Sequence, residues 1–187
     1  MSEEPKETAG ERLPGDLTKD QLIDRIIRVD HAGEFGAKRI YEGQLAILRG
    51  KPEAHVIEHM YAQELEHLKA FEKLMVERRA RPSVLHPVWN VAGFALGAAT
   101  ALMGPKAAMA CTVAVEEVID EHYRQQSERL GQDEAPLKAK IDKFRAEEAQ
   151  HRDTGLAHGA EEAAAYPLLT GAIKAGSRLA IWLAERV

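Results

Sequence analysis

The stretch Glu64-Leu65-Glu66-His67 has a second copy in this chain, Glu148-Ala149-Gln150-His151. Glu34 precedes the first stretch by 30 residues, and Glu116 precedes the second by 32. A single Glu-x-x-His arises readily by chance in a chain with 30 acidic residues and 8 histidines. Two copies at matched spacing are typical of a four-helix bundle in which two helices each give one glutamate and two each give a Glu-x-x-His. The pattern therefore predicts a di-metal carboxylate site.

The composition is that of one helical domain. A length of 187 residues fits a single core, and aromatic residues make up only 5% of the chain. We expect residues 1–17 to be a disordered polar tail and residues 18–187 to be one all-α domain. The tail has the character of neither a signal peptide nor a transit peptide.

Charge and cysteine content exclude several classes of protein. A formal net charge of -5 and the absence of a basic stripe argue against nucleic-acid binding. Cys111 is the only cysteine, so the chain has neither a disulfide framework nor a thiolate cluster for zinc or iron-sulfur. We expect a reducing compartment.

Six helices are expected from hydrophobic periodicity and from their start and stop signals. Thr18 and Gln21 form a capping box, Gly131 is expected to end the fourth helix, and Asp133 to cap the fifth. The expected helices cover residues 18–50, 52–81, 88–103, 106–131, 133 to between 155 and 159, and 166–187.

On helical wheels, each of the four glutamates lies at the centre of the apolar face of its own helix. The wheels choose Glu116 over Glu117 and Glu148 over Glu147. Four ionised carboxylates in one core would repel one another strongly, and each would be costly to bury unpaired. Two divalent cations would neutralise them, and carboxylates with a little imidazole favour iron or manganese over softer metals.

Two other functions remain as alternatives. His55-Val56-Ile57-Glu58-His59 matches the H-x-x-E-H of inverted zinc peptidases. The wheel, however, places His55 and His59 on a charged stripe opposite Glu64, which favours a solvated face. A ferritin-like iron-binding or ferroxidase protein is the other alternative.

Two segments are unusually apolar. Residues 88–115 contain one charge, Lys106, and are broken at Gly104-Pro105, so neither part reaches the length needed to span a bilayer. The last helix combines Leu179, Ile181 and Trp182 with basic residues and resembles an interfacial amphipathic helix. Membrane contact and coverage of the four-helix core are both consistent with these segments.

Beyond the metal motif, long strings of the chain closely resemble the demethoxyubiquinone hydroxylases of coenzyme Q biosynthesis, a ferritin-like di-iron monooxygenase family. The resemblance covers nearly everything after the tail. The matching strings are IIRVDHAGEFGAKRIYEGQ (26–44), QELEHLKAF (63–71), RPSVLHPVWNVAGFALGAATALMG (81–104), AMACTVAVEE (108–117), EHY (121–123), FRAEEAQHRD (144–153) and GSRLAIWLAER (176–186).

The resemblance implies a ferritin-like four-helix bundle with two additional apolar helices, and it implies a site. His122 and Tyr123 match a His-Tyr pair beside the metals, and we expect Tyr123 to act as a gate or an electron relay. The implied iron ligands are Glu34, Glu64, His67, Glu116, Glu148 and His151.

The implied reaction is an O2-dependent hydroxylation of the demethoxyubiquinol ring at two iron ions bridged by carboxylates such as Glu64 and Glu148. The electron donor is NADH or the quinol itself. Asp30 and Asp153 are expected to orient the ligand histidines.

The resemblance also implies a location and partners. The substrate is a polyprenyl quinol, and the enzyme associates peripherally with a membrane. We expect the cytoplasmic face of a bacterial inner membrane, with the matrix face of the mitochondrial inner membrane as the alternative. A lipid-binding accessory protein and a homo-oligomer are compatible with it.

Overall fold

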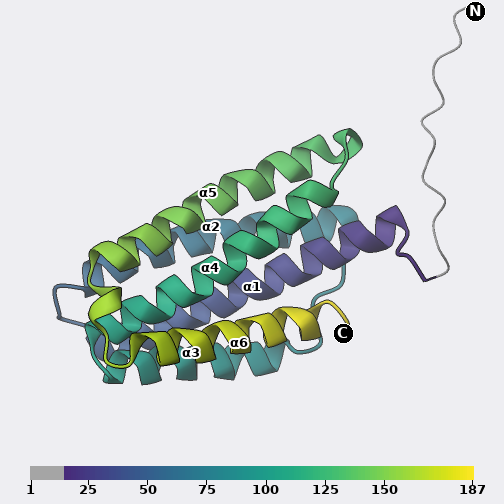
Figure 1. The fold of residues 1–187 in the computed structure, drawn as a ribbon. Coiled ribbons are helices and arrows are strands. Elements are labelled where there is room, and N and C mark those ends of the chain that lie inside the picture. The colour runs from purple at the N-terminus through teal and green to yellow at the C-terminus, as the bar shows by residue number, and fades with distance from the viewer. Residues whose placement is uncertain (1–14) are drawn as a thin grey trace, which may run out of the picture.

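The computed structural model of this chain describes residues 15–187 (Figure 1), so most of the expected tail lies outside the described residues. The described part contains helices and no strand, which confirms the all-α prediction. The six α-helices and two short 3-10 helices are α1 (Lys19–Leu48), α2 (Ala54–Arg78), α3 (His86–Leu102), α4 (Pro105–Arg129), η1 (Gln132–Glu134), α5 (Ala135–Ala157), η2 (Ala160–Glu162) and α6 (Tyr166–Ala184).

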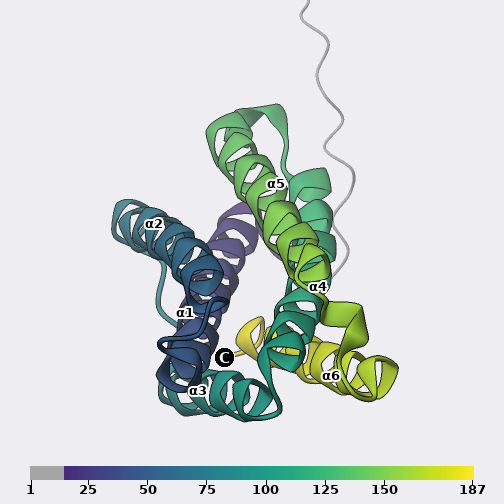
Figure 2. The same cartoon turned by 90° about the vertical axis from the view of Figure 1, so that its left-hand side faces the viewer.

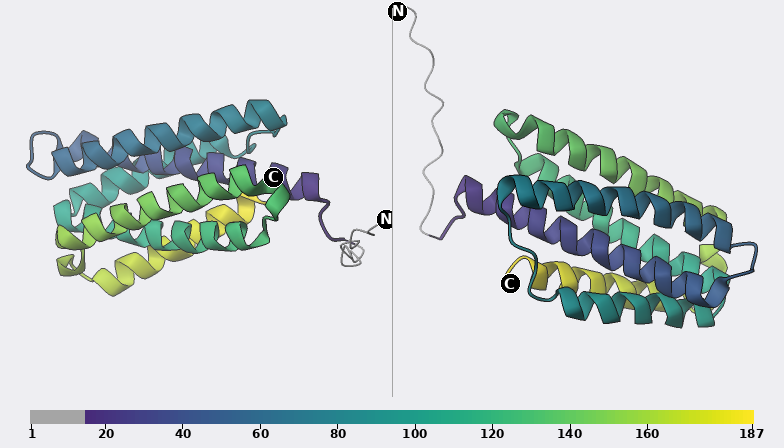
Figure 3. Two further views of the ribbon diagram at one scale, coloured as in Figure 1. Left: turned by 90° about the horizontal axis from the view of Figure 1, so that it is seen from above. Right: turned by 180° about the vertical axis from the view of Figure 1, so that it is seen from behind.

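The helices form three layers of two (Figure 2). Helices α1 and α4 form the middle layer, α2 and α5 lie on one side of it, and α3 and α6 lie on the other (Figures 1 and 3). The four-helix bundle therefore consists of α1, α2, α4 and α5. The two apolar helices, α3 and α6, cover the side of the middle layer that α2 and α5 leave open.

The start of α1 is as expected, but the junction between α4 and α5 is not. Thr18 accepts a hydrogen bond from the Gln21 backbone and returns one from its own backbone to the Gln21 side chain. Helix α4 ends at Arg129 with Leu130 as its C-cap, which is where a glycine at position 131 would end it, but Gly131 has φ −81° and does not adopt the left-handed conformation of a glycine cap. Asp133 caps nothing, because η1 intervenes before α5 and its carboxylate pairs with Lys19. The position of the helix end was therefore predicted correctly, whereas the glycine cap and the Asp133 cap were wrong.

Helices α1 and α3 touch through their backbones. A Cβ atom added to Gly97 would lie 1.9 Å from the carbonyl oxygen of Ile40, and one added to Gly43 would lie 2.2 Å from that of Phe94. Only glycine permits this approach, so these two residues fix α3 against the middle layer.

Helix α3 ends at the Gly104-Pro105 break that the sequence shows. Gly104 has φ +116°, and Pro105 begins α4. Among residues 15–187, no helix combines the length and apolarity needed to cross a membrane, as the break predicts.

Candidate metal centre

Six buried side chains from the four bundle helices form two overlapping groups. We call them the His67 group, which is Glu34, Glu64, His67 and Glu148, and the His151 group, which is Glu64, Glu116, Glu148 and His151. Within each group, one ligand atom from every member lies within 4.8 Å of the others. All six residues are at most 3% exposed. The sequence-derived ligand set is thus brought together in full.

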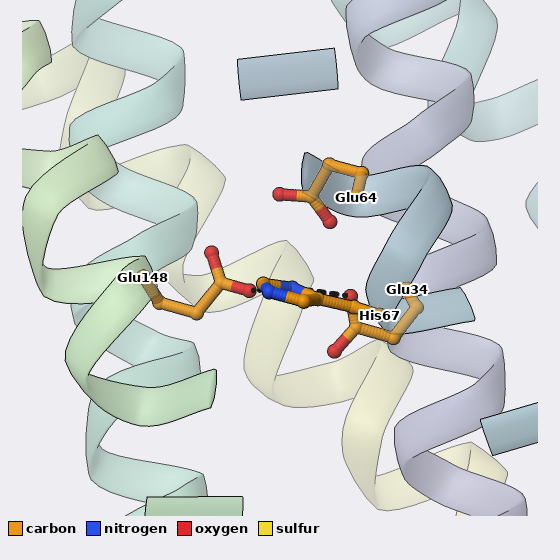
Figure 4. Close-up of side chains that lie close together, drawn as sticks. All are labelled: Glu34, Glu64, His67 and Glu148. Carbon is orange, nitrogen blue, oxygen red and sulfur yellow. Dashed lines mark hydrogen bonds and ion pairs between the residues drawn. The ribbon is translucent and has the colours of Figure 1, made fainter. Parts of the chain in front are cut away.

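Glu148 lies between the two histidines. Its Oε1 is 2.9 Å from His67 Nδ1, and its Oε2 is 3.0 Å from His151 Nδ1. Figure 4 shows Glu34 from α1, Glu64 and His67 from α2, and Glu148 from α5 pointing toward one another. Because Glu64 and Glu148 belong to both groups, they have the position of carboxylates that bridge two cations.

The donor set fits two divalent cations. Both carboxylate oxygens of Glu64 are buried without a well-formed hydrogen bond among the described residues, and the nearest partner of Glu64 Oε1 is His151 Nδ1 at 3.2 Å, an atom that also lies 3.0 Å from Glu148 Oε2. Such oxygens are costly to bury unless a cation or a proton meets them. Oxygen ligands with one imidazole per group suit iron or manganese.

The pKa values of these side chains also indicate that the site requires positive charge. Burial and the charges of Glu148 and Glu34 raise the pKa of Glu64 well above its usual value, and burial with Glu148 and Glu64 does the same to the pKa of Glu116. Burial would raise the pKa of Glu148 too, but its hydrogen bonds to the two histidines lower that pKa to about 2. Burial would lower the pKa of His67, yet Glu148 and Glu34 raise it to about 12. The buried carboxylates therefore require positive charge beside them, from protons or from cations.

The outward-facing nitrogens of the two histidines contact residues that the sequence reasoning did not select. His67 Nε2 lies 2.9 Å from Glu147 Oε2, and His151 Nε2 lies 3.0 Å from Gln63 Oε1. Gln63 and Glu147 each stand immediately before a Glu-x-x-His, and each contacts the histidine of the other copy. The repeated register was a signal that could have identified them.

The expectation for Asp30 and Asp153 was wrong. Asp30 is buried, but it accepts a 2.7 Å hydrogen bond from Gln126 Nε2 and lies 3.7 Å from His122 Nε2. The Asp153 side chain is 63% exposed and pairs with Arg152. A helical wheel gives the direction of a side chain and not its reach, so it could not separate these residues from true partners of the ligands.

Two tyrosines donate hydrogen bonds to the outer glutamates. Tyr123 donates to Glu34, and Tyr41 donates to Glu116 at 3.2 Å. Tyr123 therefore contacts the His67 group, which is the position beside the metals that the resemblance implies. His122 lies beside it and accepts a hydrogen bond from Gln126 in the tautomer whose Nε2 is unprotonated.

The chain is similar in sequence to known proteins over nearly its whole length. Residues 21–184 match the family described as "Ubiquinone biosynthesis protein COQ7". The chain belongs to this family. It is 62% identical over 183 residues to "3-demethoxyubiquinol 3-hydroxylase" of Rhodospirillum rubrum, covering 97% of this chain and 86% of the relative. It is 56% identical to the human "NADPH-dependent 3-demethoxyubiquinone 3-hydroxylase, mitochondrial", covering 88% of this chain and 78% of the relative. The Saccharomyces cerevisiae "5-demethoxyubiquinone hydroxylase, mitochondrial" is 42% identical, with 89% and 78% covered.

This COQ7-family chain gives no support to the zinc peptidase alternative. The His55 side chain is 88% exposed and lies 3.4 Å from Glu58, which is 58% exposed. His59 is also exposed, and none of the three belongs to a cluster with metal-ligand geometry among residues 15–187. The solvated face that the wheel indicates is the observed arrangement.

The COQ7-family chain also contains an apolar cavity of about 340 Å³ between α1, α3, α4 and α6. A smaller pocket shares five lining residues with it and extends to Glu34, Glu116, Glu148 and Tyr123. The five shared residues are Val29, Gly33, Ala37, Ile119 and Ile181. The cavity therefore adjoins the metal centre from the side covered by the two apolar helices.

Proposed function

We propose that this chain hydroxylates the ring of 3-demethoxyubiquinol in ubiquinone biosynthesis and that its centre holds two iron ions. The observation that carries the proposal is the pair of buried groups sharing Glu64 and Glu148. Family membership supplies the reaction, because relatives at 42–62% identity are named as demethoxyubiquinol or demethoxyubiquinone hydroxylases.

The substrate is proposed to enter through the apolar cavity. A polyprenyl tail is a long hydrocarbon, and the cavity walls are Val, Ala, Gly, Leu, Ile and Trp with a single serine. The polar ring is proposed to lie at the end of the cavity that adjoins the smaller pocket beside Glu34 and Tyr123, because that pocket, at about 20 Å³, holds little more than one water molecule. In this proposal the ring carbon to be hydroxylated would lie beside the residues that hold the metals.

The residues of the chain then have distinct roles. When bound, the di-iron centre supplies the reductive activation of dioxygen. Glu34, Glu116 and the two histidines hold the outer positions, and the buried surroundings exclude bulk water. Tyr123 holds a proton against Glu34 and, with His122 next to it, is our candidate for the gate or electron relay.

Peripheral membrane association is part of the proposal. Large apolar side chains on α3 and α6 are exposed, including Val91 at 68%, Leu168 at 76% and Trp182 at 50%. These two helices also form the outer wall of the cavity, so a quinol could pass from a bilayer into it. We propose the cytoplasmic face of a bacterial inner membrane as the site. A lipid-binding partner and a homo-oligomer stay predictions.

The first experiment is anaerobic loading with ferrous iron, followed by Mössbauer spectroscopy before and after oxygen. We expect about two irons per chain and a coupled diferric signal, then quinol hydroxylation in single turnovers with NADH or with quinol as the only reductant. Glu116→Ala, which removes a ligand of the His151 group alone, should lose one iron and the hydroxylation.

Two results would contradict the proposal. A Glu116→Ala protein with unchanged iron content and turnover would refute the site. Rapid ferrous oxidation by the wild type without any quinol product would favour the ferroxidase alternative.

A further inference from the structure

The two halves of the metal centre differ in what supports their histidines. His67 Nδ1 faces the carboxylates of its group, and its Nε2 faces the Glu147 carboxylate. His151 Nδ1 likewise faces Glu148, but its Nε2 faces the Gln63 amide. The two copies of the repeat therefore place a partner at the same nitrogen of each histidine, but the partner of His67 is charged and that of His151 is neutral.

Both contacts select the same tautomer. The Glu147 carboxylate can only accept, so Nε2 of His67 keeps its proton when a cation replaces the proton on Nδ1. The Gln63 carbonyl oxygen accepts in the same way from Nε2 of His151. A negatively charged acceptor forms a stronger hydrogen bond with the imidazole N–H than a neutral acceptor does. The other ring nitrogen is then more basic and binds a metal ion more tightly.

The surroundings of Glu147 preserve this difference. One of its oxygens lies 3.2 Å from Lys143 Nζ, and the other is the partner of His67. The carboxylate side chain is 23% exposed and the Lys143 side chain 63%, so solvent weakens the ion pair more than it weakens the contact with the 2%-exposed His67.

We propose that Glu147 and Gln63 are positioning residues that make the two metal positions inequivalent, so that the cation at His67 binds first and more tightly. This inference rests on the metal centre of the proposed function and goes beyond it, because neither residue is a ligand. Partners of this kind commonly change metal affinity by about 10- to 100-fold.

The test measures the affinity of each position separately with Mn²⁺, using electron paramagnetic resonance to count free and bound ions. Glu116→Ala removes a ligand found only in the His151 group and leaves the His67 position, whereas Glu34→Ala does the reverse. We expect the Glu116→Ala protein to bind one Mn²⁺ at least about tenfold more tightly than the Glu34→Ala protein.

Reciprocal changes then assign the cause. In the Glu116→Ala background, Glu147→Gln should weaken Mn²⁺ binding about tenfold, and in the Glu34→Ala background it should change nothing. Gln63→Glu should tighten binding in the Glu34→Ala background, a gain that a merely structural role would not produce. Lys143→Gln, which removes the ion pair and keeps the carboxylate, should not weaken binding in either background.

Equal affinities in the two single-position proteins, or an equal loss in both on Glu147→Gln, would overturn the inference. A wild-type protein that binds no Mn²⁺ pair would instead refute the metal centre itself. The two failures are therefore distinguishable.

Discussion

Tyr123 contacts the His67 group through a hydrogen bond, which its hydroxyl donates to Glu34 in the buried core. A hydrogen bond to a charged group is worth about 1.5–3 kcal/mol. We expect Tyr123→Phe to keep both metal ions and to lower quinol turnover about 10- to 100-fold, measured as kcat by product chromatography with iron content assayed on the same sample.

The matched control is Tyr61→Phe. Tyr61 also donates to a glutamate, Glu42, at 3.0 Å, but outside the metal centre. Turnover should stay within about twofold of wild type in this variant. Equal losses in the two variants would mean that Tyr123 has no special role at the site.

At the residue scale, the sequence predicted which glutamates are buried in the candidate centre, because the burial of a carboxylate is visible on a helical wheel. Glu116 and Glu148 were chosen correctly over Glu117 and Glu147 as the inward-facing members of their pairs. Glu147 nonetheless contacts His67, because a long side chain at the edge of a face can reach a neighbouring helix. Contacts between helices depend on helix spacing, which periodicity within one helix does not contain.

At the scale of the helix, the contact between α1 and α3 depends on the missing side chain of Gly97. A Cβ atom there would overlap the Ile40 carbonyl, so α3 would have to move. We expect Gly97→Ala to lower the free energy of unfolding by about 1–3 kcal/mol or more, measured by urea denaturation. Gly171→Ala in α6, where nothing lies within 4 Å, should instead be neutral or stabilising by about 0.5–1 kcal/mol. A neutral Gly97→Ala would contradict the backbone contact.

The cavity wall on α1 gives a different prediction. Gly36 lines the cavity, and a Cβ atom there meets nothing within 4 Å, so a larger side chain can fill the space without moving the backbone. We expect Gly36→Leu to raise KM for the quinol at least about tenfold with unchanged metal content and equal or greater thermal stability. Gly171→Leu is the control for the helix effect. An unchanged KM would show that the substrate does not use this cavity.

Helix positions were predictable because their apolar periodicity and stop signals are local. The α4–α5 junction was not, because Asp133 pairs with Lys19, which is distant in sequence, and η1 occupies the place of the expected cap. Glycine near a helix end indicated a left-handed cap, but the chain leaves α4 in an extended conformation at Leu130. Long-range ion pairs of this kind have no signal in a single sequence.

For the molecule as a whole, the buried carboxylates make stability depend on pH and on metal together. The pKa values of Glu64 and Glu116 are raised, so above about pH 4.3 the unfolded chain loses protons that the folded chain keeps, and folding weakens as pH rises. The pKa values of His67 and His151 are also raised, so their contribution is complete below about pH 6.5 and declines above it. The lowered pKa of Glu148 contributes stability that is complete above about pH 4.5 and is lost as the pH falls toward about 2.

Metal ions should reverse this trend, because they keep the carboxylates ionised in the folded state. We expect the difference in Tm between Mn²⁺-loaded and metal-free protein to widen steadily from about pH 5 to pH 8, measured by calorimetry. A difference that is constant over this range would mean that the buried carboxylates exchange no protons for metal.

Two neighbouring pairs of residues join the cavity to the centre along the chain itself. Gly33 and Val115 line the cavity, while the next residues, Glu34 and Glu116, belong to the metal groups. A molecule bound in the cavity that shifts α1 or α4 by a fraction of an ångström would therefore also shift Glu34 or Glu116. Binding in the cavity and metal binding would then be coupled, with the same free energy in both directions. We therefore expect metal loading to change the affinity of the cavity for the quinol, and the quinol to change the affinity of the centre for metal by the same factor.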